Sequence, residues 1–402
     1  MSEVREGYKM TELGEIPSEW EVVSFKNCCS IVSGLVDPNE EKYKEYPHIG
    51  NANIEKESGK LLKYNLVKDE NLISGKFLFN EKHVLYGKIN PHFAKAAYPM
   101  FGGLCSADMY PIETNLEILI PEYLLYLILD NRFTKAMTAN SARTGIPKVN
   151  KQEMDSYKFI LPTIEEQQKI SSILSTVDEQ IDETQQLIVK TKELKKGLMQ
   201  QLLTKGIGHT EFKQTELGEI PLEWNIYVLE EIVTILDGMR KPIKKNDRKP
   251  GKIPYYGATG VIDWVDNYIF EEQLILVGED GENLRSRVLP MAFKIHGKTW
   301  VNNHAHVLKP NQNINIDYLT YYLESIDYDD YITGSAQPKL NQAQLKKIKT
   351  LIPTLQEQQK IASILSTVDA QIEVYEQEKV KYEELKKGLM QQLLTGQVRV
   401  KI

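Results

Sequence analysis

The chain of 402 residues has only three cysteines, no long apolar run and no excess of positive charge. Cys28, Cys29 and Cys105 are too few and too irregularly spaced for a disulfide framework or a metal site. We interpret them as small buried apolar residues of a protein in a reducing compartment. The longest apolar run ends at Asp130 and is too short to span a bilayer, and residues 1–10 lack the apolar core of a signal peptide. We therefore expect a soluble, cytoplasmic protein that makes no contact with a membrane.

The net charge of −7 argues at first against a nucleic-acid partner, because binding to phosphate needs lysine and arginine on the contacting surface. The acidic residues are unevenly distributed, however. The segments 165–204 and 356–395 each carry five lysines against seven acidic residues, so together they account for four of the seven net negative charges. The rest of the chain is closer to neutral and can hold local cationic surfaces.

Two blocks of sequence occur twice. TELGEIPSEW at 11–20 returns as TELGEIPLEW at 215–224, which is 204 residues later. The block 161–204 returns at 352–395, which is 191 residues later, so the segments between the blocks differ in length by 13 residues. These intervening segments share little sequence. The chain is therefore a tandem duplication in which the frame was retained and the segments between its parts diverged.

The second block has the signature of a long helix in both copies. It begins with Pro162 and Thr163 or with Pro353 and Thr354, continues with good helix formers, and is followed by glycine. Its apolar residues recur at steps compatible with a heptad. About 40 residues correspond to roughly 60 Å of helix, which is too long for one small domain to cover. We expect the two helices to pack on each other as an antiparallel coiled coil.

The intervening segments contain short β-rich runs bounded by glycine, proline and asparagine, such as HVLYGKI at 83–89 and QLILVGED at 273–280. A helical stretch precedes each copy of the second block. The predicted fold class is thus α+β, with two mixed, β-rich globular domains at 1–160 and 207–351. The segments 161–206 and 352–402 contain the helices.

Three short motifs suggest catalytic or metal chemistry, but each is incomplete. Residues 90–93, Asn-Pro-His-Phe, resemble the target-binding loop of amino-methyltransferases, but the second proline and a preceding Gly-x-Gly cofactor loop are missing. Residues 296–299, His-Gly-Lys-Thr, lack the first glycine of a phosphate-binding loop. His304 and His306 would share one face of a strand, but no nearby Cys, Asp or Glu completes a metal site, so we favour DNA or core contact. We predict no catalytic and no metal-binding residues.

Cationic and polar side chains gather instead in the intervening segments. Residues 238–252 carry seven lysines and arginines against one aspartate and could neutralise several phosphates, although a solvated loop is the alternative. Asparagine and arginine side chains can read adenine and guanine edges through two hydrogen bonds. The candidate DNA-binding residues of the first domain are Lys88, Asn90, His92, Lys95, Arg143, Thr144 and Lys148. Those of the second domain are Arg240, Lys241, Lys244, Lys245, Tyr255, Tyr256, Arg285, Asn302, Asn303, His304, Gln337 and Lys339.

The repeated motifs carry a resemblance to a known family. Leu-Gly-Glu-Ile-Pro-x-x-Trp, a variable stretch, Pro-Thr-x-x-Glu-Gln-Gln-Lys-Ile and Gly-Leu-Met-Gln-Gln-Leu-Leu-Thr, each present twice, resemble the specificity subunit of type I restriction-modification systems. The resemblance covers essentially the whole chain. It implies two target-recognition domains on an antiparallel helical spacer, each reading one half of a split, asymmetric DNA sequence.

The resemblance also implies the partners. Two modification subunits would bind S-adenosylmethionine and methylate adenine at N6, and restriction subunits would use ATP and Mg²⁺, so this chain itself would hold no cofactor and catalyse no reaction. It implies that the helices dock these subunits. The apolar positions that we assign to docking are Ile170, Leu174, Val177, Ile181, Leu198, Leu202, Ile361, Leu365, Val368, Ile372, Leu389 and Leu393.

Two other functions remain open from the residues alone. A divergent DNA methyltransferase would bind S-adenosylmethionine without a partner subunit. A coiled-coil adaptor would bind proteins in a salt-insensitive way and would have no affinity for DNA. If the chain is a specificity subunit, the length of the helices should set the number of unread base pairs between the half-sites.

Overall fold

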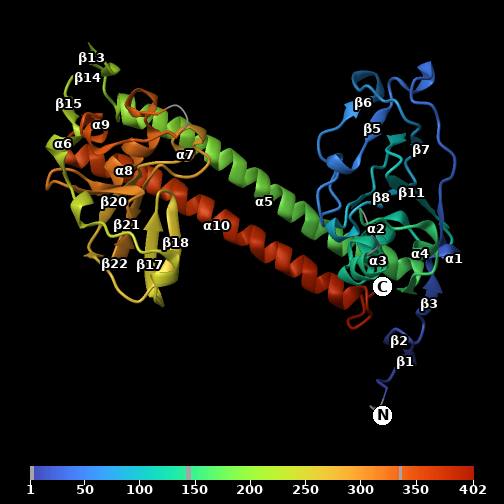
Figure 1. Ribbon diagram of the computed structural model, residues 1–402. Helices are drawn as coiled ribbons and strands as arrows, with labels where there is room; N and C mark the ends of the chain where they lie inside the picture. The colour runs from blue at the N-terminus through green and yellow to red at the C-terminus, as the bar shows by residue number, and fades with distance from the viewer. Residues whose placement is uncertain (1–3, 142–145, 335–336) are drawn as a thin grey trace. The chain divides into compact units, whose positions relative to one another are not determined.

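The computed structural model describes residues 4–141, 146–334 and 337–402. The chain forms two compact units. The first unit comprises Met1–Thr184 and Glu378–Ile402, and the second comprises Gln185–Gln377. Both long helices, α5 (Ile164–Lys205) and α10 (Leu355–Leu393), contribute to both units. Each unit therefore contains one globular domain and parts of both helices (Figure 1).

The first domain is a mixed α+β fold. Its helices are α1 (Phe25–Cys28), α2 (Pro121–Leu129), α3 (Asn131–Ser141) and α4 (Lys151–Asp155). Its strands are β1 (Tyr8–Thr11), β2 (Gly14–Pro17), β3 (Glu21–Ser24), β4 (Cys29–Ile31), β5 (Pro47–Ile49), β6 (Asn65–Leu66), β7 (Phe77–Phe79), β8 (Val84–Gly87), β9 (Ala96–Ala97), β10 (Gly103–Cys105), β11 (Met109–Thr114) and β12 (Lys158–Leu161).

The second domain has its strands in the same order, while its short helices lie at partly different places. Its helices are α6 (Leu229–Ile232), α7 (Asn283–Ser286), α8 (Ile316–Ser325) and α9 (Gln342–Lys346). Its strands are β13 (Phe212–Thr215), β14 (Gly218–Pro221), β15 (Asn225–Val228), β16 (Val233–Ile235), β17 (Pro250–Gly257), β18 (Gly260–Val265), β19 (Phe270–Glu271), β20 (Leu274–Gly278), β21 (Ala292–Ile295), β22 (Lys298–Val301), β23 (Ala305–Pro310) and β24 (Lys349–Ile352).

The sheets of the two domains have the same topology although their sequences differ. One four-stranded sheet has the order β4-β11-β8-β9 in the first domain and β16-β23-β20-β21 in the second. The other has the orders β6-β5-β10-β7 and β18-β17-β22-β19, with one parallel pair in each, β5 with β10 and β17 with β22. The central strands β8 and β20 are buried along their whole length, as expected for apolar runs covered on both faces. Both copies of the duplication thus retain one architecture.

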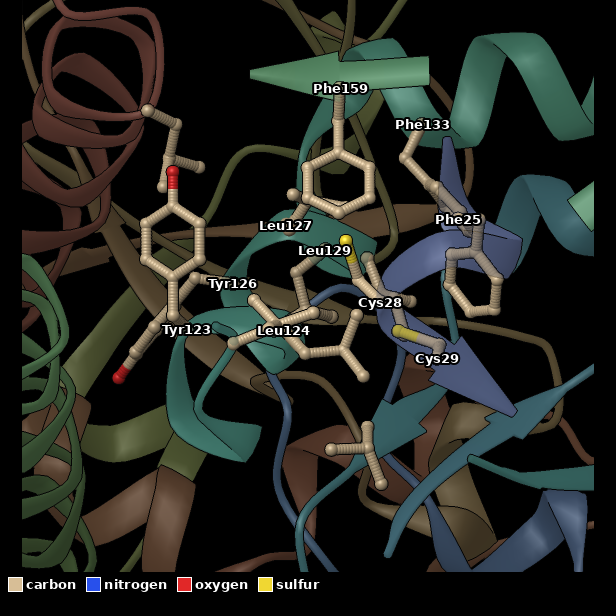
Figure 2. Packing of buried hydrophobic residues seen from close by; sticks show 14 of the residues in the cluster. Phe25, Cys28, Cys29, Tyr123, Leu124, Tyr126, Leu127, Leu129, Phe133 and Phe159 are labelled. Carbon is tan, nitrogen blue, oxygen red and sulfur yellow. The ribbon is translucent and has the colours of Figure 1, made fainter. Parts of the chain in front are cut away.

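The main core of the first domain lies between α2 and the elements around β3 and β4. Figure 2 shows side chains of this core, with Leu124 and Leu127 of α2 near Phe25 and Cys28. The free thiols of Cys28, Cys29 and Cys105 are buried, and burial raises the pKa of each thiol. These cysteines therefore act as apolar core residues, as their small number suggested.

The repeated blocks contact each other in both units. Trp20 of the first block donates its indole N–H to Oε2 of Glu166 at 2.5 Å, and Trp224 donates to Oε2 of Glu357 at 3.0 Å. Glu166 and Glu357 lie in the first turns of α5 and α10, where a negative charge is favoured by the helix dipole. The tryptophan of the first block and the glutamate of the second block therefore recur together, because each tryptophan N–H binds the carboxylate of the glutamate in the same unit.

The two long helices run antiparallel within each unit. In the first unit Lys386 of α10 forms an ion pair of 2.6 Å with Asp178 of α5, and in the second Lys195 of α5 forms the same pair with Asp369 of α10. The start of one helix thus lies beside the end of the other in both units. The α+β fold class with an antiparallel pair of long helices is confirmed.

The apolar positions assigned to subunit docking are used mainly inside the chain. Ile170, Leu174 and Leu393 belong to the core of the first unit, and Leu202, Ile361 and Leu365 belong to that of the second. Val177 and Ile372 are also buried, while Ile181, Leu198, Val368 and Leu389 are half-buried. The eight buried side chains cannot meet a partner, because other parts of the chain already cover them. Among the described residues, no helix is long and apolar enough to cross a membrane.

Candidate nucleic-acid interface

The segments that precede α4 and α9 form equivalent corners of the two domains. Lys148 forms a β-bridge with Ile89, just after β8, and Lys339 forms the same bridge with Asp280, just after β20. Asn150 and Asn341 fix the corners by capping α4 and α9 with their side-chain oxygens. Each corner therefore lies beside the connection that leaves the central strand. We name these connections the β8–β9 connection, residues 88–95, and the β20–β21 connection, residues 279–291.

Lys88 lies at the base of the corner of the first domain. It is buried, and its Nζ is 4.5 Å from the centroid of the Tyr110 ring. Burial lowers the pKa of Lys88, and the positive charge of Lys148 lowers it further. The Tyr110 hydroxyl donates to the carbonyl oxygen of Val149 at 3.3 Å and so ties the strand to the corner. The first domain thus places two lysines side by side, one buried and one exposed.

The other candidates of the first domain have different environments. Asn90 adopts a left-handed conformation at φ 52° and precedes the short 3₁₀ turn η4 (Pro91–Phe93), in which His92 is exposed. Lys95 is half-buried, and its Nζ donates to the carbonyl oxygen of Asn51. Its ammonium group is therefore engaged within the domain. Arg143 and Thr144 lie outside the described residues.

The cationic segment of the second domain is divided between surface and interior. Lys241, Lys244 and Lys245 are exposed, as a phosphate-binding role would require. Arg240 instead points inward, and its Nη1 donates to Oε2 of Glu279 at 2.5 Å and to the carbonyl oxygen of Ala305 at 2.8 Å. The structure contradicts the assignment of Arg240 to phosphate contact, because its guanidinium is neutralised inside the domain.

A buried histidine links the segments around Arg240. Nδ1 of His306 lies 2.6 Å from Oδ2 of Asp237, and its Nε2 lies 2.7 Å from the carbonyl oxygen of Leu340 in the corner. Each ring nitrogen therefore faces an oxygen atom of a different element. His306 thus joins β23, the corner and the segment before Arg240.

Glu279 completes this network from the end of β20. Its Oε1 lies 3.1 Å from Nζ of Lys339, while Oε2 accepts from Arg240. Asp237, Glu279 and His306 bring one possible metal ligand each to within 4.8 Å of one another. The cations of Arg240 and Lys339 already occupy the carboxylates, so the chemistry fits an ion-pair network better than a metal site. We name these five residues the ionic network of the second domain.

The sequence alone does not predict this network. Most of its contacts join residues far apart in sequence, for example 39 positions for Arg240 with Glu279 and 70 positions for Asp237 with the β23 backbone. His306 was grouped with His304, but only His304 is exposed, where its Nδ1 lies 2.9 Å from the carboxylate of Asp280. The one available signal was a histidine inside an otherwise apolar strand, which needs buried partners.

Two further candidates are also interior residues. Tyr255 is 1% exposed, and its hydroxyl accepts a hydrogen bond from the backbone N–H of Ile243 at 2.9 Å. Asn302 is 4% exposed, and its side-chain oxygen accepts from the backbone N–H of His304. The structure contradicts their assignment to the DNA-contacting surface, because neither side chain reaches solvent. Tyr256 is half-buried against Phe293.

The candidates that remain accessible in the second domain gather at the corner and the ends of the central strands. Arg285 donates to the carbonyl oxygen of Gly334 at 3.3 Å, which joins the β20–β21 connection to the corner. The exposed side chains among the candidates here are Arg285, Asn303, His304, Gln337 and Lys339.

Comparison with known proteins agrees with this architecture. A family model described as type I restriction modification DNA specificity domain matches residues 17–193 and 221–384. The chain is 29% identical to the type I restriction enzyme MjaVIII specificity subunit of Methanocaldococcus jannaschii, over 98% of this chain and 97% of that protein. It is 30% identical to the EcoDI specificity subunit of Escherichia coli over 40% of this chain and 36% of that protein.

Two solved structures share the fold. The type I restriction-modification S subunit of M. genitalium superposes with a TM-score of 0.60 at 16% identity, covering 96% of this chain and 98% of that one. A chain from a study of complex assembly and conformational transition of a type I restriction-modification system superposes with a TM-score of 0.60 at 18% identity, covering 95% and 99%. With two family matches that together span most of its length, the chain belongs to the type I restriction-modification DNA specificity family.

Proposed function

We propose that this chain gives a type I restriction-modification complex its DNA sequence specificity by reading a bipartite, asymmetric target. Each domain would read one half-site on double-stranded DNA. The chain itself would be non-catalytic, and adenine N6 methylation would be performed by modification subunits that it positions. Such a role belongs in the cytoplasm, where the DNA is.

One observation carries this proposal, namely that equivalent positions of one architecture present opposite charges. Lys88 follows β8 in the first domain, and Glu279 follows β20 in the second. The backbone of each is paired in the same way, because Val149 donates to the carbonyl oxygen of Lys88 and Leu340 donates to that of Glu279. Two domains with the same frame and different side chains at equivalent positions are suited to two different half-sites.

The partners follow from the family and remain part of the proposal. Two modification subunits would supply S-adenosylmethionine, and restriction subunits would supply ATP and Mg²⁺ chemistry. The apolar faces of α5 and α10 are largely buried in the cores of the two units. We therefore expect partners to contact the exposed polar faces of these helices.

Mapping of methylated adenines tests the proposal. The full chain would be expressed with its modification subunit in a host that lacks adenine methylation, and N6-methyladenine would be located by sequencing. We expect one motif with two unlike halves separated by unread base pairs. A symmetric motif, or the absence of any sequence-specific methylation, would contradict the proposal. Salt-insensitive partner binding together with no DNA affinity in the assembled complex would favour the adaptor instead.

A further inference from the structure

The backbone strain of the described residues is concentrated in the two equivalent connections. Five of the non-glycine residues that the structure describes have positive φ, and three of them, Asn90, Ala94 and Arg287, lie in the β8–β9 and β20–β21 connections. A left-handed backbone is unfavourable for alanine and arginine, whose side chains do not compensate for it locally. Such strain persists only where the surrounding structure imposes it. Both domains therefore hold the same connection in a fixed, unfavourable conformation.

The β20–β21 connection is held rigidly from two sides. The guanidinium of Arg287 donates to the carbonyl oxygens of Glu324 and Ile326 and lies 5.4 Å from the centroid of the Tyr328 ring. The side chain of Asn283 then fixes the backbone of Leu289, accepting from its N–H at 2.8 Å and donating to its carbonyl oxygen at 2.9 Å. The short segment between these anchors has little freedom to move.

The residues at the tip of this connection are apolar and exposed. Val288 is 80% exposed and Leu289 is 50% exposed, although the polar groups around them are engaged with the domain. Exposed apolar side chains add nothing to the stability of the domain. Arg285 lies three residues before Val288 and is exposed and cationic. It also joins the connection to the corner. A rigid apolar tip beside an exposed cation fits an edge of duplex DNA, where the cation meets a phosphate.

The equivalent connection in the first domain presents a different tip. His92 is exposed there, with its ring centroid 4.1 Å from that of Phe93, and Nζ of Lys56 lies 3.7 Å from the Phe93 centroid. The strained connection thus carries a polar aromatic side chain in one domain and an aliphatic pair in the other. This is the difference expected of elements that read different bases.

We propose that Val288 and Leu289 of the β20–β21 connection determine specificity by apolar contact with the 5-methyl group of a thymine in the major groove. The methyl group is the feature that distinguishes thymine there for an aliphatic side chain. The assignment rests on the proposed function and adds to it one base type in the half-site of the second domain.

Thymine-to-deoxyuridine substitution tests the contact, because it removes only the methyl group. The full chain assembled with its modification subunit would bind duplexes that carry its mapped target, with each thymine of the second domain's half-site replaced in turn. We expect one position at which the replacement weakens binding about fourfold, as for one buried methyl group. In the double variant Val288→Ser, Leu289→Ser, binding to the thymine duplex should weaken by a similar or greater factor, and deoxyuridine should then have no further effect.

Leu222→Ser is the matched control, because Leu222 is also 50% exposed but belongs to the repeated block. It should bind as the unmodified chain does and retain the sensitivity to deoxyuridine. The proposal is overturned if the second half-site contains no thymine, if no replacement weakens binding, or if the double variant keeps the wild-type sensitivity. If the unmodified chain still binds its target specifically, any of these results leaves the proposed function intact. If the unmodified chain shows no specific binding at all, both the thymine contact and the proposed function are overturned.

Discussion

At the scale of single residues, the ionic network decides which candidates can touch DNA. Arg240 is paired with Glu279 and Asp237, so it positions the β23 and β20 ends and does not offer a free charge. His306 holds the corner through the carbonyl oxygen of Leu340. The exposed readers of the second domain therefore depend on a buried framework of charges.

Replacement of His306 by alanine should strongly destabilise the second unit. It leaves the buried Asp237 without its main partner, and breaking a buried charged pair costs about 3–5 kcal/mol. Urea unfolding of the full chain would measure the loss. Lys309→Ala is the control on the same strand, because its pair with Glu272 is largely exposed and contributes at most about 1 kcal/mol. Equal losses in the two variants would show that the network has no special role.

The same network should make the second unit sensitive to acid. Burial raises the pKa of Asp237, but the hydrogen bond and charge of His306, the Val307 N–H and the charge of Arg240 together hold it below its ordinary value of about 4. The pKa of Glu279 is also lowered, because the partners Arg240, His306 and Lys339 outweigh burial. A lowered folded pKa stabilises the fold above the unfolded pKa, and this contribution is lost as the pH falls below it.

Urea midpoints measured between pH 6 and pH 3 would test this dependence. We expect the midpoint of the unmodified chain to fall more steeply below about pH 4 than that of Asp237→Asn, which has no carboxylate to protonate at this position. Asp247→Asn, in the exposed cationic segment, should behave as the unmodified chain does. Parallel curves for all three proteins would contradict the expectation.

The accessible candidates could be predicted from sequence, but the buried ones could not. Lys148 and Lys339 lie 191 residues apart, which is the offset of the second repeated block, and the structure places them at equivalent corners. Tyr255 precedes two glycines and Asn302 stands in a polar run, and both patterns favour a surface loop. Their burial depends on the parallel pairing of β17 with β22, which brings together residues about 45 positions apart. Local sequence contains no signal for such a pairing.

At the scale of elements, the repeated blocks work as pairs and not as separate motifs. Glu166 accepts from Trp20 and is bound by Arg399 from the segment after α10. Glu357 accepts from Trp224 and is bound by His209 from the segment after α5. The residues that follow each long helix therefore complete the start of the other helix. The repeated blocks and the long helices could be predicted from the sequence. The contacts that the segment after each long helix makes with the start of the other helix are visible only in the structure.

The two glutamates should contribute equally to stability, one in each unit. Glu166→Gln and Glu357→Gln preserve the shape of the side chain but replace a charged acceptor, which should cost about 1.5–3 kcal/mol in each case. Thermal and urea unfolding would report the change. Glu165→Gln, at the exposed neighbouring position, should change the stability little. A neutral effect at Glu166 would mean that the tryptophan contact does not require charge.

At the scale of the whole molecule, the duplication allows one domain to be replaced by the other. The junctions can lie in sequence that both copies share, Glu15–Pro17 with Glu219–Pro221 at one side and Pro162–Thr163 with Pro353–Thr354 at the other. Residues 222–352 would then replace residues 18–161. The graft brings its own tryptophan to the glutamate at the start of α5, so the contact that holds a domain on its helix is preserved.

A chain with two copies of the second domain should direct methylation to a target whose two half-sites contain the same bases. The reason is that each domain has its own core and the same sheet topology, so the surface of the graft should be unchanged. Methylation mapping with the modification subunit measures the result, and a graft of the first domain's own residues 18–161 from an independent clone controls for assembly. If the original asymmetric motif persisted, reading of the half-sites could not belong to the replaced segment. If both halves changed to a sequence found in neither original half, the domains would not read DNA independently, and specificity would have to arise from residues that the two units share.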